Sequence, residues 1–323
     1  MATIQTINIG AAANDNTGDP LRTAFDKQNQ NNTALNNDLA SKAPLANASF
    51  TTDIVVNQVR VGKGGGGLVA NTVVGFSSGQ SGTTGQSNTY FGNNSGYFNQ
   101  FGNSNTCLGA SAGYNNISDD NTFVGSGAGI VNTNGTKNTY LGKNSGSTVN
   151  NTNCTALGNT STITGDNQVQ LGNASTTTYV YGTVQNRSDL RDKADVQDTV
   201  LGLDFISKLR PVDYKWDMRE DYKDEFPIQG ELSDEDFKIE MDLWLENGKL
   251  SNLKQDGSKK RNRFHHGFIA QEVRDLGIEF GGFQDHSKNG GEDVLSIGYD
   301  EFIAPMIKAI QELKAEIELL KAK

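Results

Sequence analysis

The chain has 323 residues, enough for two or three domains, and its 37 glycines and 35% hydrophobic content argue against one ordinary core throughout. The formal net charge of −10 argues against a nucleic-acid-binding surface, which needs clustered lysine and arginine. No run of about 18 apolar residues is present, so we expect no membrane insertion.

The two cysteines, Cys107 and Cys154, lie far apart and outside any CxxC or CxxH motif, so we expect neither a disulfide nor a metal site. The segment Met1–Thr6 has neither the basic region nor the apolar core of a secretory signal. We therefore expect a soluble protein made in a cytosol. We also expect no cofactor, because Gly125–Gly129 is not a GxGxxG motif and no GxxxxGK[ST] motif occurs.

The first region, residues 1–60, is predicted to contain one long helix. Asp19 is suited to cap it, Pro20 suits its first position, and Pro44 cannot continue it. Between these points, side chains recur at steps of four and three, the spacing of a coiled-coil seam with amides in its middle. A single amphipathic surface helix is the alternative. The seam consists of Leu21, Phe25, Gln28, Asn32, Leu35 and Leu39.

The second region, residues 61–182, repeats a short apolar segment that ends in glycine. Typical copies are Asn88-Thr89-Tyr90-Phe91-Gly92 and Asn121-Thr122-Phe123-Val124-Gly125. A near-fixed period with one short strand per unit indicates a stacked β architecture. The closing glycines, which recur at nearly constant spacing, are Gly75, Gly92, Gly109, Gly125, Gly142, Gly158 and Gly172.

Each repeat offers only two or three apolar side chains. Ordering one residue costs about 1–2 kcal/mol of backbone entropy, whereas each buried side chain returns about 1.5–3 kcal/mol. One chain alone therefore looks too poor in apolar surface, and three chains sharing a core would supply what is missing. We expect a homotrimeric β-roll or β-helix-like shaft.

The third region, residues 183–323, is ordinary charged and apolar sequence of α+β type. Arg210–Trp216 alternates as a strand with Val212, Tyr214 and Trp216 on one face. The strongly charged segment 217–262 is predicted to be an exposed excursion, partly helical around 233–246. An amphipathic helix is predicted over Gly267–Gly277, ended by glycine.

The last segment, 300–323, has the strict spacing of a coiled coil. Glu316 and Lys321 take positions that can pair between parallel chains. Such a seam supports association of chains without fixing their number, and a helix packed on its own domain is the alternative. The seam consists of Ile303, Met306, Ile310, Leu313, Ile317 and Leu320.

Ser188 and Lys193 stand where the repeats give way to the third region. A serine hydroxyl becomes a good nucleophile when a base removes its proton, and an uncharged lysine can do so. Their separation along the chain suits neither one helix face nor one strand face, so a turn would have to bring the pair together. On spacing alone, a solvated surface is the commoner interpretation. For His265, His266 and His286 we expect capping or surface roles.

Three motifs in order resemble the intramolecular chaperone domain of bacteriophage tail fibres and tailspikes, the peptidase S74 family. They are Ser188-Asp189-Leu190-Arg191-Asp192-Lys193, Leu209-Arg210-Pro211-Val212-Asp213-Tyr214-Lys215-Trp216 and His266-Gly267-Phe268-Ile269-Ala270-Gln271-Glu272-Val273, followed by the terminal coiled coil. The resemblance implies a trimeric domain that helps an upstream β-rich trimer to fold. It also implies one self-cleavage event, with no activity on an external substrate.

Carried onto this chain, the resemblance makes Ser188 the nucleophile, Lys193 its base and Arg187–Ser188 the scissile bond. The family usually has an apolar residue before the lysine. Here it is Asp192, whose carboxylate favours the charged form of Lys193. A chain that is cut slowly or not at all therefore stays an open alternative.

The other regions agree with a phage fibre. Residues 10–27 are similar to N-terminal segments of virion fibre proteins, residues 42–51 resemble a recurrent tail-fibre segment, and the repeats look like the β-roll heads of trimeric adhesins. We expect a mixed, elongated homotrimer, assembled in the host cytoplasm. Residues 1–60 would attach to phage tail or neck proteins, and the shaft would meet a host surface receptor.

Three alternatives stay open. One is an uncleaved structural or neck fibre whose third region stays as a trimeric tip. The second is a trimeric bacterial adhesin-like protein, and the third is an enzyme acting on host glycan, although no paired carboxylates occur in the repeats.

Overall fold

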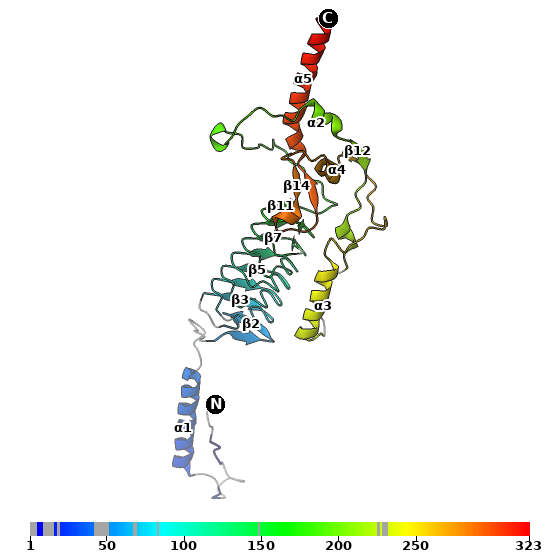
Figure 1. Ribbon diagram of the computed structural model, residues 1–323. Coiled ribbons are helices and arrows are strands. Elements are labelled where there is room, and N and C mark those ends of the chain that lie inside the picture. Colours follow the sequence, from blue (N-terminus) through cyan, green and yellow to red (C-terminus); the bar gives the residue numbers. More distant parts are fainter. Residues whose placement is uncertain are drawn as a thin grey trace. The chain divides into compact units, whose positions relative to one another are not determined.

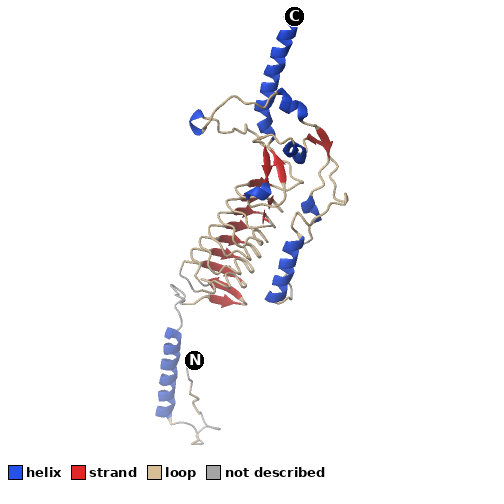
Figure 2. Cartoon of the chain, viewed as in Figure 1, coloured by secondary structure: helices blue, strands red, loops and turns tan. Residues whose placement is uncertain are grey.

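The structure is a computed structural model that describes residues 5–8, 16–17, 20–41, 52–66, 70–82, 84–147, 149–224, 227 and 232–323. The chain divides into two compact units, residues 1–53 and 54–323, which are treated separately below. Figure 1 labels the helices and strands, and Figure 2 distinguishes helices, strands and loops by colour.

The first unit contains the predicted helix, α1 (Leu21–Ser41). The carbonyl of Pro20 accepts the first helical bond from the amide of Ala24 at 2.9 Å. Residues 5–8 contact the helix through Asn31, which exchanges hydrogen bonds of 2.7 and 2.8 Å with the backbone of Gln5. Two residues of the predicted seam, Phe25 and Leu35, are exposed, and pairing of this helix with other copies stays a prediction. Asp19 and Pro44 lie outside the described residues.

The second unit begins with a stacked β-solenoid, as the repeats predicted. A hairpin of β1 (Ile54–Val56) and β2 (Val59–Gly62) leads into a parallel ladder. Its strands are β3 (Thr72–Gly75), β4 (Thr89–Phe91), β5 (Thr106–Leu108), β6 (Thr122–Val124), β7 (Thr139–Leu141), β9 (Thr155–Leu157) and β11 (Val169–Leu171). A second, two-stranded sheet pairs β8 (Gly146–Ser147) with β10 (Thr162–Ile163). In Figure 2 the strands form successive rungs joined by tan loops.

One chain fills the interior of its own solenoid, so the argument that a single chain lacks enough core was wrong. The middle residue of each strand points inward, and the rings of Phe123 and Tyr140 stack with centroids 5.2 Å apart. That argument did not include the buried asparagines, which also fill the core. The inward residues, all at most 3% exposed, are Val73, Tyr90, Cys107, Phe123, Tyr140 and Ala156.

The asparagines that precede β4, β5, β6 and β7 are buried and form a ladder along the solenoid. The side-chain oxygen of Asn88 accepts from the amide of Asn105 at 2.9 Å, and that of Asn105 accepts from the amide of Asn121 at 3.0 Å. The pattern continues from Asn121 to Asn138 at 3.0 Å. Buried polar groups cost little when they are hydrogen-bonded, so the ladder lets polar side chains fill a core that is poor in apolar atoms.

Glycine is required at the end of each repeat because the backbones of successive turns approach closely there. Gly109 has φ +135°, and a Cβ atom there would lie 2.6 Å from the carbonyl carbon of Gly125 in the next turn. No other residue type avoids both the strained backbone and this contact. The glycine spacing in the sequence therefore reports the stacking of turns.

The C-terminal domain is built around a small aromatic core of Phe205, Val273, Phe280 and Phe302. Its elements are α2 (Leu203–Lys208), β12 (Val212–Tyr214), β13 (His265–Gly267), α4 (Ala270–Asp275), β14 (Phe283–Asp285), β15 (Leu295–Ile297) and α5 (Ile303–Lys321). β12 pairs antiparallel with β13, and β14 with β15. The helix predicted from Gly267 starts only at Ala270, because His265–Gly267 extends to pair with β12.

The charged insertion contains the predicted helix, α3 (Asp234–Asn247), capped by the hydroxyl of Ser233. The prediction that this insertion is simply exposed was wrong, because Phe237 and Met241 are buried against side chains of the solenoid. Their partners are Tyr97, Tyr114, Ile130 and Val131.

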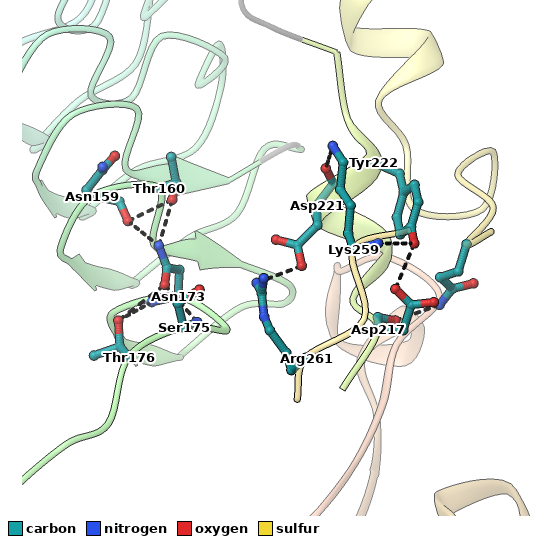
Figure 3. Close-up of polar contacts among 11 residues, drawn as sticks. Asn159, Thr160, Asn173, Ser175, Thr176, Asp217, Asp221, Tyr222, Lys259 and Arg261 are labelled. Carbon is teal, nitrogen blue, oxygen red and sulfur yellow. Dashed lines mark hydrogen bonds and ion pairs between the residues drawn. The ribbon is translucent and has the colours of Figure 1, made fainter. Parts of the chain in front are cut away.

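Polar contacts hold the ends of the insertion together (Figure 3). Tyr222 donates its hydroxyl proton to Asp217 at 2.8 Å, and Arg261 forms an ion pair with Asp221 at 2.7 Å. The amide of Lys259 donates to the hydroxyl of Tyr222 at 3.1 Å. The two chain segments that flank α3 are therefore tied to each other.

The terminal helix α5 packs on its own domain and also leaves its predicted seam open. Pro305 and Ala309 are buried, and Glu312 accepts a hydrogen bond from the amide of Leu203 in α2 at 2.7 Å. The seam residues Ile303, Met306, Ile310, Leu313, Ile317 and Leu320 are exposed in the single chain.

Candidate functional site

The predicted Ser188/Lys193 pair lies in an exposed connection between β11 and α2. The segment is largely loop, which leaves both residues open to solvent. It contains one short 3₁₀ turn, η1 (Leu190–Asp192). Asp189 caps this turn by accepting a hydrogen bond from the amide of Arg191 at 2.9 Å.

The 3₁₀ turn supplies the reversal that the spacing of the pair required. The amide of Lys193 donates to the carbonyl of Leu190 at 3.1 Å, which folds the chain back. As a result, the Nζ atom of Lys193 donates a hydrogen bond to the Oγ atom of Ser188 at 2.7 Å. The structure thus brings the two residues into direct contact.

Asp192, which the sequence placed beside Lys193, is bound by a different cation. Its Oδ2 atom accepts from the Nε atom of Arg187 at 2.7 Å. Arg191 makes a separate pair with Asp189, and these hydrogen bonds lower the pKa of the Asp189 carboxyl and raise the pKa of the Arg191 guanidinium. Both carboxylates of the motif therefore have arginine partners, and Lys193 contacts the serine.

One contact that sequence reasoning missed attaches this connection to the C-terminal domain. The side-chain amide of Asn186 donates to the Oδ2 atom of Asp300 at 3.0 Å. Asp300 lies in the 3₁₀ turn η4 (Tyr299–Phe302), 114 residues further along the chain. No sequence pattern links two single polar residues over such a distance.

The arrangement can support attack of Ser188 on the carbonyl carbon of Arg187. A hydroxyl in contact with an amine can transfer its proton to that amine when the amine is uncharged. Both side chains are exposed, so water can reach an ester formed between the two residues.

The three histidines lie apart from this chemistry. His266 pairs with Asp213 across β12 and β13 at 2.6 Å on the exposed face. In the described structure, no hydrogen bond joins a histidine to Ser188 or Lys193. The surface role expected for His286 was wrong, because it is only 8% exposed.

His286 joins the last solenoid turn to the C-terminal domain. Its Nδ1 atom lies 2.7 Å from the hydroxyl of Thr164 and 3.1 Å from the Nε2 atom of Gln168. Since Gln168 Oε1 accepts from the amide of Thr164, its Nε2 faces the histidine as a donor. Nδ1 is therefore an acceptor, and the Nε2–H group donates to Ser296 at 2.8 Å. Burial lowers the pKa of this imidazole.

Among the described residues, no helix combines the length and apolarity needed to cross a membrane. Over the same residues, no three His, Cys, Asp or Glu side chains are arranged to hold a metal ion. Cys107 and Cys154 are buried free thiols. Comparison of the chain with protein-family models, with curated proteins and with solved structures gave no match.

Proposed function

We propose that the chain is the subunit of a homotrimeric bacteriophage fibre. Its C-terminal region, residues 188–323, guides folding of the shaft and is then released by self-cleavage between Arg187 and Ser188. The observation that carries this proposal is the 2.7 Å contact between Ser188 Oγ and Lys193 Nζ in the exposed connection between shaft and C-terminal domain.

In the proposed reaction, uncharged Lys193 accepts the hydroxyl proton of Ser188 as Oγ attacks the carbonyl carbon of Arg187. The peptide C–N bond breaks, and the proton passes to the nitrogen of Ser188, which becomes a free amino group. The product is an ester between Arg187 and the serine oxygen. Water then hydrolyses this ester and separates the two fragments. The reaction occurs once per chain and has no external substrate.

The architecture of the shaft explains why a folding domain is useful. Each parallel strand pairs with the strand of the next repeat, and the repeats are similar enough to allow pairing in the wrong turn. The C-terminal domain contacts the last turn directly: the amide of Asp166 donates to the carbonyl of Asn289 at 2.8 Å, and the amide of Glu292 to that of Thr164 at 3.1 Å. It can therefore hold the last turn in place while the preceding turns form.

The exposed seam of α5 supports the trimeric part of the proposal. A helix with an apolar seam at coiled-coil spacing gains stability by covering that seam with other copies. Joining three chains at this point raises the local concentration of the three shafts. Removal of the domain afterwards would leave a shaft that is slow to unfold, because its assembly aid is gone.

The remaining parts of the proposal rest on the resemblance of the N-terminal segments. Residues 1–60 would attach the fibre to phage tail or neck proteins, and the shaft would bind a host surface receptor. Assembly would take place in the host cytoplasm before the fibre joins the virion. An uncleaved fibre whose C-terminal domain stays as a tip is the second candidate, because Ser188 and Lys193 lie in an open loop.

The test compares the wild-type chain with Ser188→Ala, and uses Ser207→Ala as a matched control within the same domain. We expect the wild type and the control to yield two fragments on a denaturing gel, one ending at Arg187 and one beginning at Ser188. Ser188→Ala should stay at 34.8 kDa. A wild-type chain that stays full length after folding would rule out self-cleavage and favour the uncleaved fibre. Light scattering on the Ser188→Ala chain should give three times the subunit mass.

A further inference from the structure

The outer face of the shaft's parallel sheet has two continuous columns of side chains. In β4, β5, β6, β7 and β9 the middle residue is buried and the residues on either side point outward. In β11 the middle residue, Gln170, is half-buried. The first column is threonine in six of the seven parallel strands. The second column, called here the apolar ladder, consists of Val74, Phe91, Leu108, Val124, Leu141, Leu157 and Leu171.

The apolar ladder is straight because the register of the sheet has no offsets. Phe91 pairs with Leu108, Leu108 with Val124, and Val124 with Leu141. With strands about 4.8 Å apart, seven rungs make a ladder about 29 Å long. Four of its side chains are exposed, Phe91 at 53%, Leu108 at 45%, Leu141 at 38% and Leu171 at 48%. The other three are half-buried. A continuous apolar strip that leaves large side chains such as Phe91 and Leu108 exposed marks an interaction surface.

The threonine column beside the apolar ladder places no charged side chains there that would oppose association. Charged side chains on a surface oppose association, but here the flanking column is threonine in all but its last position. The sequence has no lysine or arginine between Lys63 and Lys137. The solenoid side chains that receive α3 are different ones, Tyr97, Tyr114, Ile130 and Val131. The insertion therefore leaves the ladder open.

We propose that the apolar ladder is the face through which shafts of this chain pack against one another, parallel and in register. A second copy offers the same row of side chains at the same spacing, whereas another partner would need a matching period of about 4.8 Å along its whole length. This inference rests on the proposed function only for the number of copies, which is three; the surface itself follows from the exposure and register of the strands.

Contact between two apolar ladders does not strongly favour one alignment of the two shafts over another. A slip of one rung still places apolar side chains opposite apolar side chains, because the column is almost uniform. The heptad seam of α5 has a different period and cannot slip by one rung without losing its own packing. The two surfaces therefore have separate roles: the ladder supplies contact area, and α5 fixes the alignment.

The test places one thiol on the ladder. Leu108→Cys in the full-length Ser188→Ala chain is treated with a short bismaleimide, with Asn134→Cys as the control on an exposed loop. The native Cys107 and Cys154 are 1% exposed and should not react in the folded chain. We expect covalent dimers from Leu108→Cys in up to about two thirds of subunits, since three thiols meet around a threefold axis, and none from Asn134→Cys.

The outcomes separate this inference from the proposed function. A trimeric mass without dimers from Leu108→Cys would overturn the ladder interface and leave the trimeric fibre standing. Equal dimer yields from both variants would also overturn it, since contact would then not depend on the ladder. A monomeric mass for the parent chain would contradict both proposals.

Discussion

The guanidinium of Arg187 binds the carboxylate of Asp192 at 2.7 Å, across the same turn that joins Lys193 to Ser188. The sequence alone suggested that Asp192 would hold Lys193 in its charged form. The structure gives that carboxylate another partner, which is the residue on the acyl side of the predicted scissile bond. Arg187 thereby limits the influence of Asp192 on the lysine.

This relationship predicts opposite effects for two substitutions on the rate of self-cleavage. Asp192→Asn removes a carboxylate that can compete with Ser188 for contact with Lys193, so cleavage should be faster. Arg187→Ala leaves Asp192 free to bind Lys193, so cleavage should be slower. Because the pair is exposed, each effect should be less than about fivefold. Timed samples on a denaturing gel measure the rates, and changes in the same direction would contradict the assignment.

The asparagine ladder predicts that removing one of its side-chain amides lowers the free energy of unfolding substantially. Asn105→Ala removes the acceptor for the amide of Asn121 and the donor to the carbonyl of Ser118. A buried group left without a partner costs about 1–3 kcal/mol, so the free energy of unfolding should fall by about 2–4 kcal/mol. Urea titration followed by circular dichroism measures it. The exposed Asn93→Ala should change it by less than about 0.5 kcal/mol, and equal losses would show that the ladder adds nothing.

Because α3 packs on the outside of the solenoid, we expect that weakening this contact destabilises α3 and leaves the solenoid strands stable. Phe237 is 2% exposed among aromatic and aliphatic side chains, and truncation of such a residue costs about 3–5 kcal/mol. In Phe237→Ala, the amides of α3 should exchange faster with solvent deuterium while those of β5 and β6 keep their protection. Ile239→Ala, on the exposed face of the same helix, is the control. Unchanged exchange in α3 would mean that this contact does not hold the helix.

His286 predicts a loss of stability in mild acid. Burial lowers its pKa below the ordinary value of 6.5, so the folded chain binds fewer protons at this group than the unfolded chain. The neutral imidazole thus contributes fully above about pH 6.5. That contribution is lost as the pH falls from there through the folded pKa.

The measurement is urea unfolding of the wild type and of His286→Gln at about pH 7.5 and about pH 5, on either side of the ordinary histidine pKa. The wild type should lose more stability between these values than the variant, whose side chain does not titrate. Asp285, the neighbouring acid, has a lowered pKa and contributes in a separate window below its ordinary value of 3.8. Identical losses in the two proteins would exclude His286 as the titrating group.

Much of the shaft could be predicted from the sequence because its signal is local. A glycine at nearly constant spacing, after a threonine-led apolar segment, predicts one strand per turn, and the pairing of Tyr90 with Cys107 and of Phe123 with Tyr140 confirms it. The failed step was the estimate of the core. The estimate counted apolar side chains alone, and only the stacking of turns places the side-chain oxygen of Asn105 on the amide of Asn121.

The candidate site divides in the same way. The sequence by itself singled out Ser188 and Lys193, because the ordered motif that contains them resembles a known self-cleavage motif. Only the tertiary structure decided that a turn capped by Asp189 joins them, that Arg187 takes Asp192, and that His286 meets Thr164 from 122 residues away. Such contacts depend on how distant segments pack and on which of several possible partners each charged group contacts. Neither of these can be predicted from a periodic pattern in the sequence.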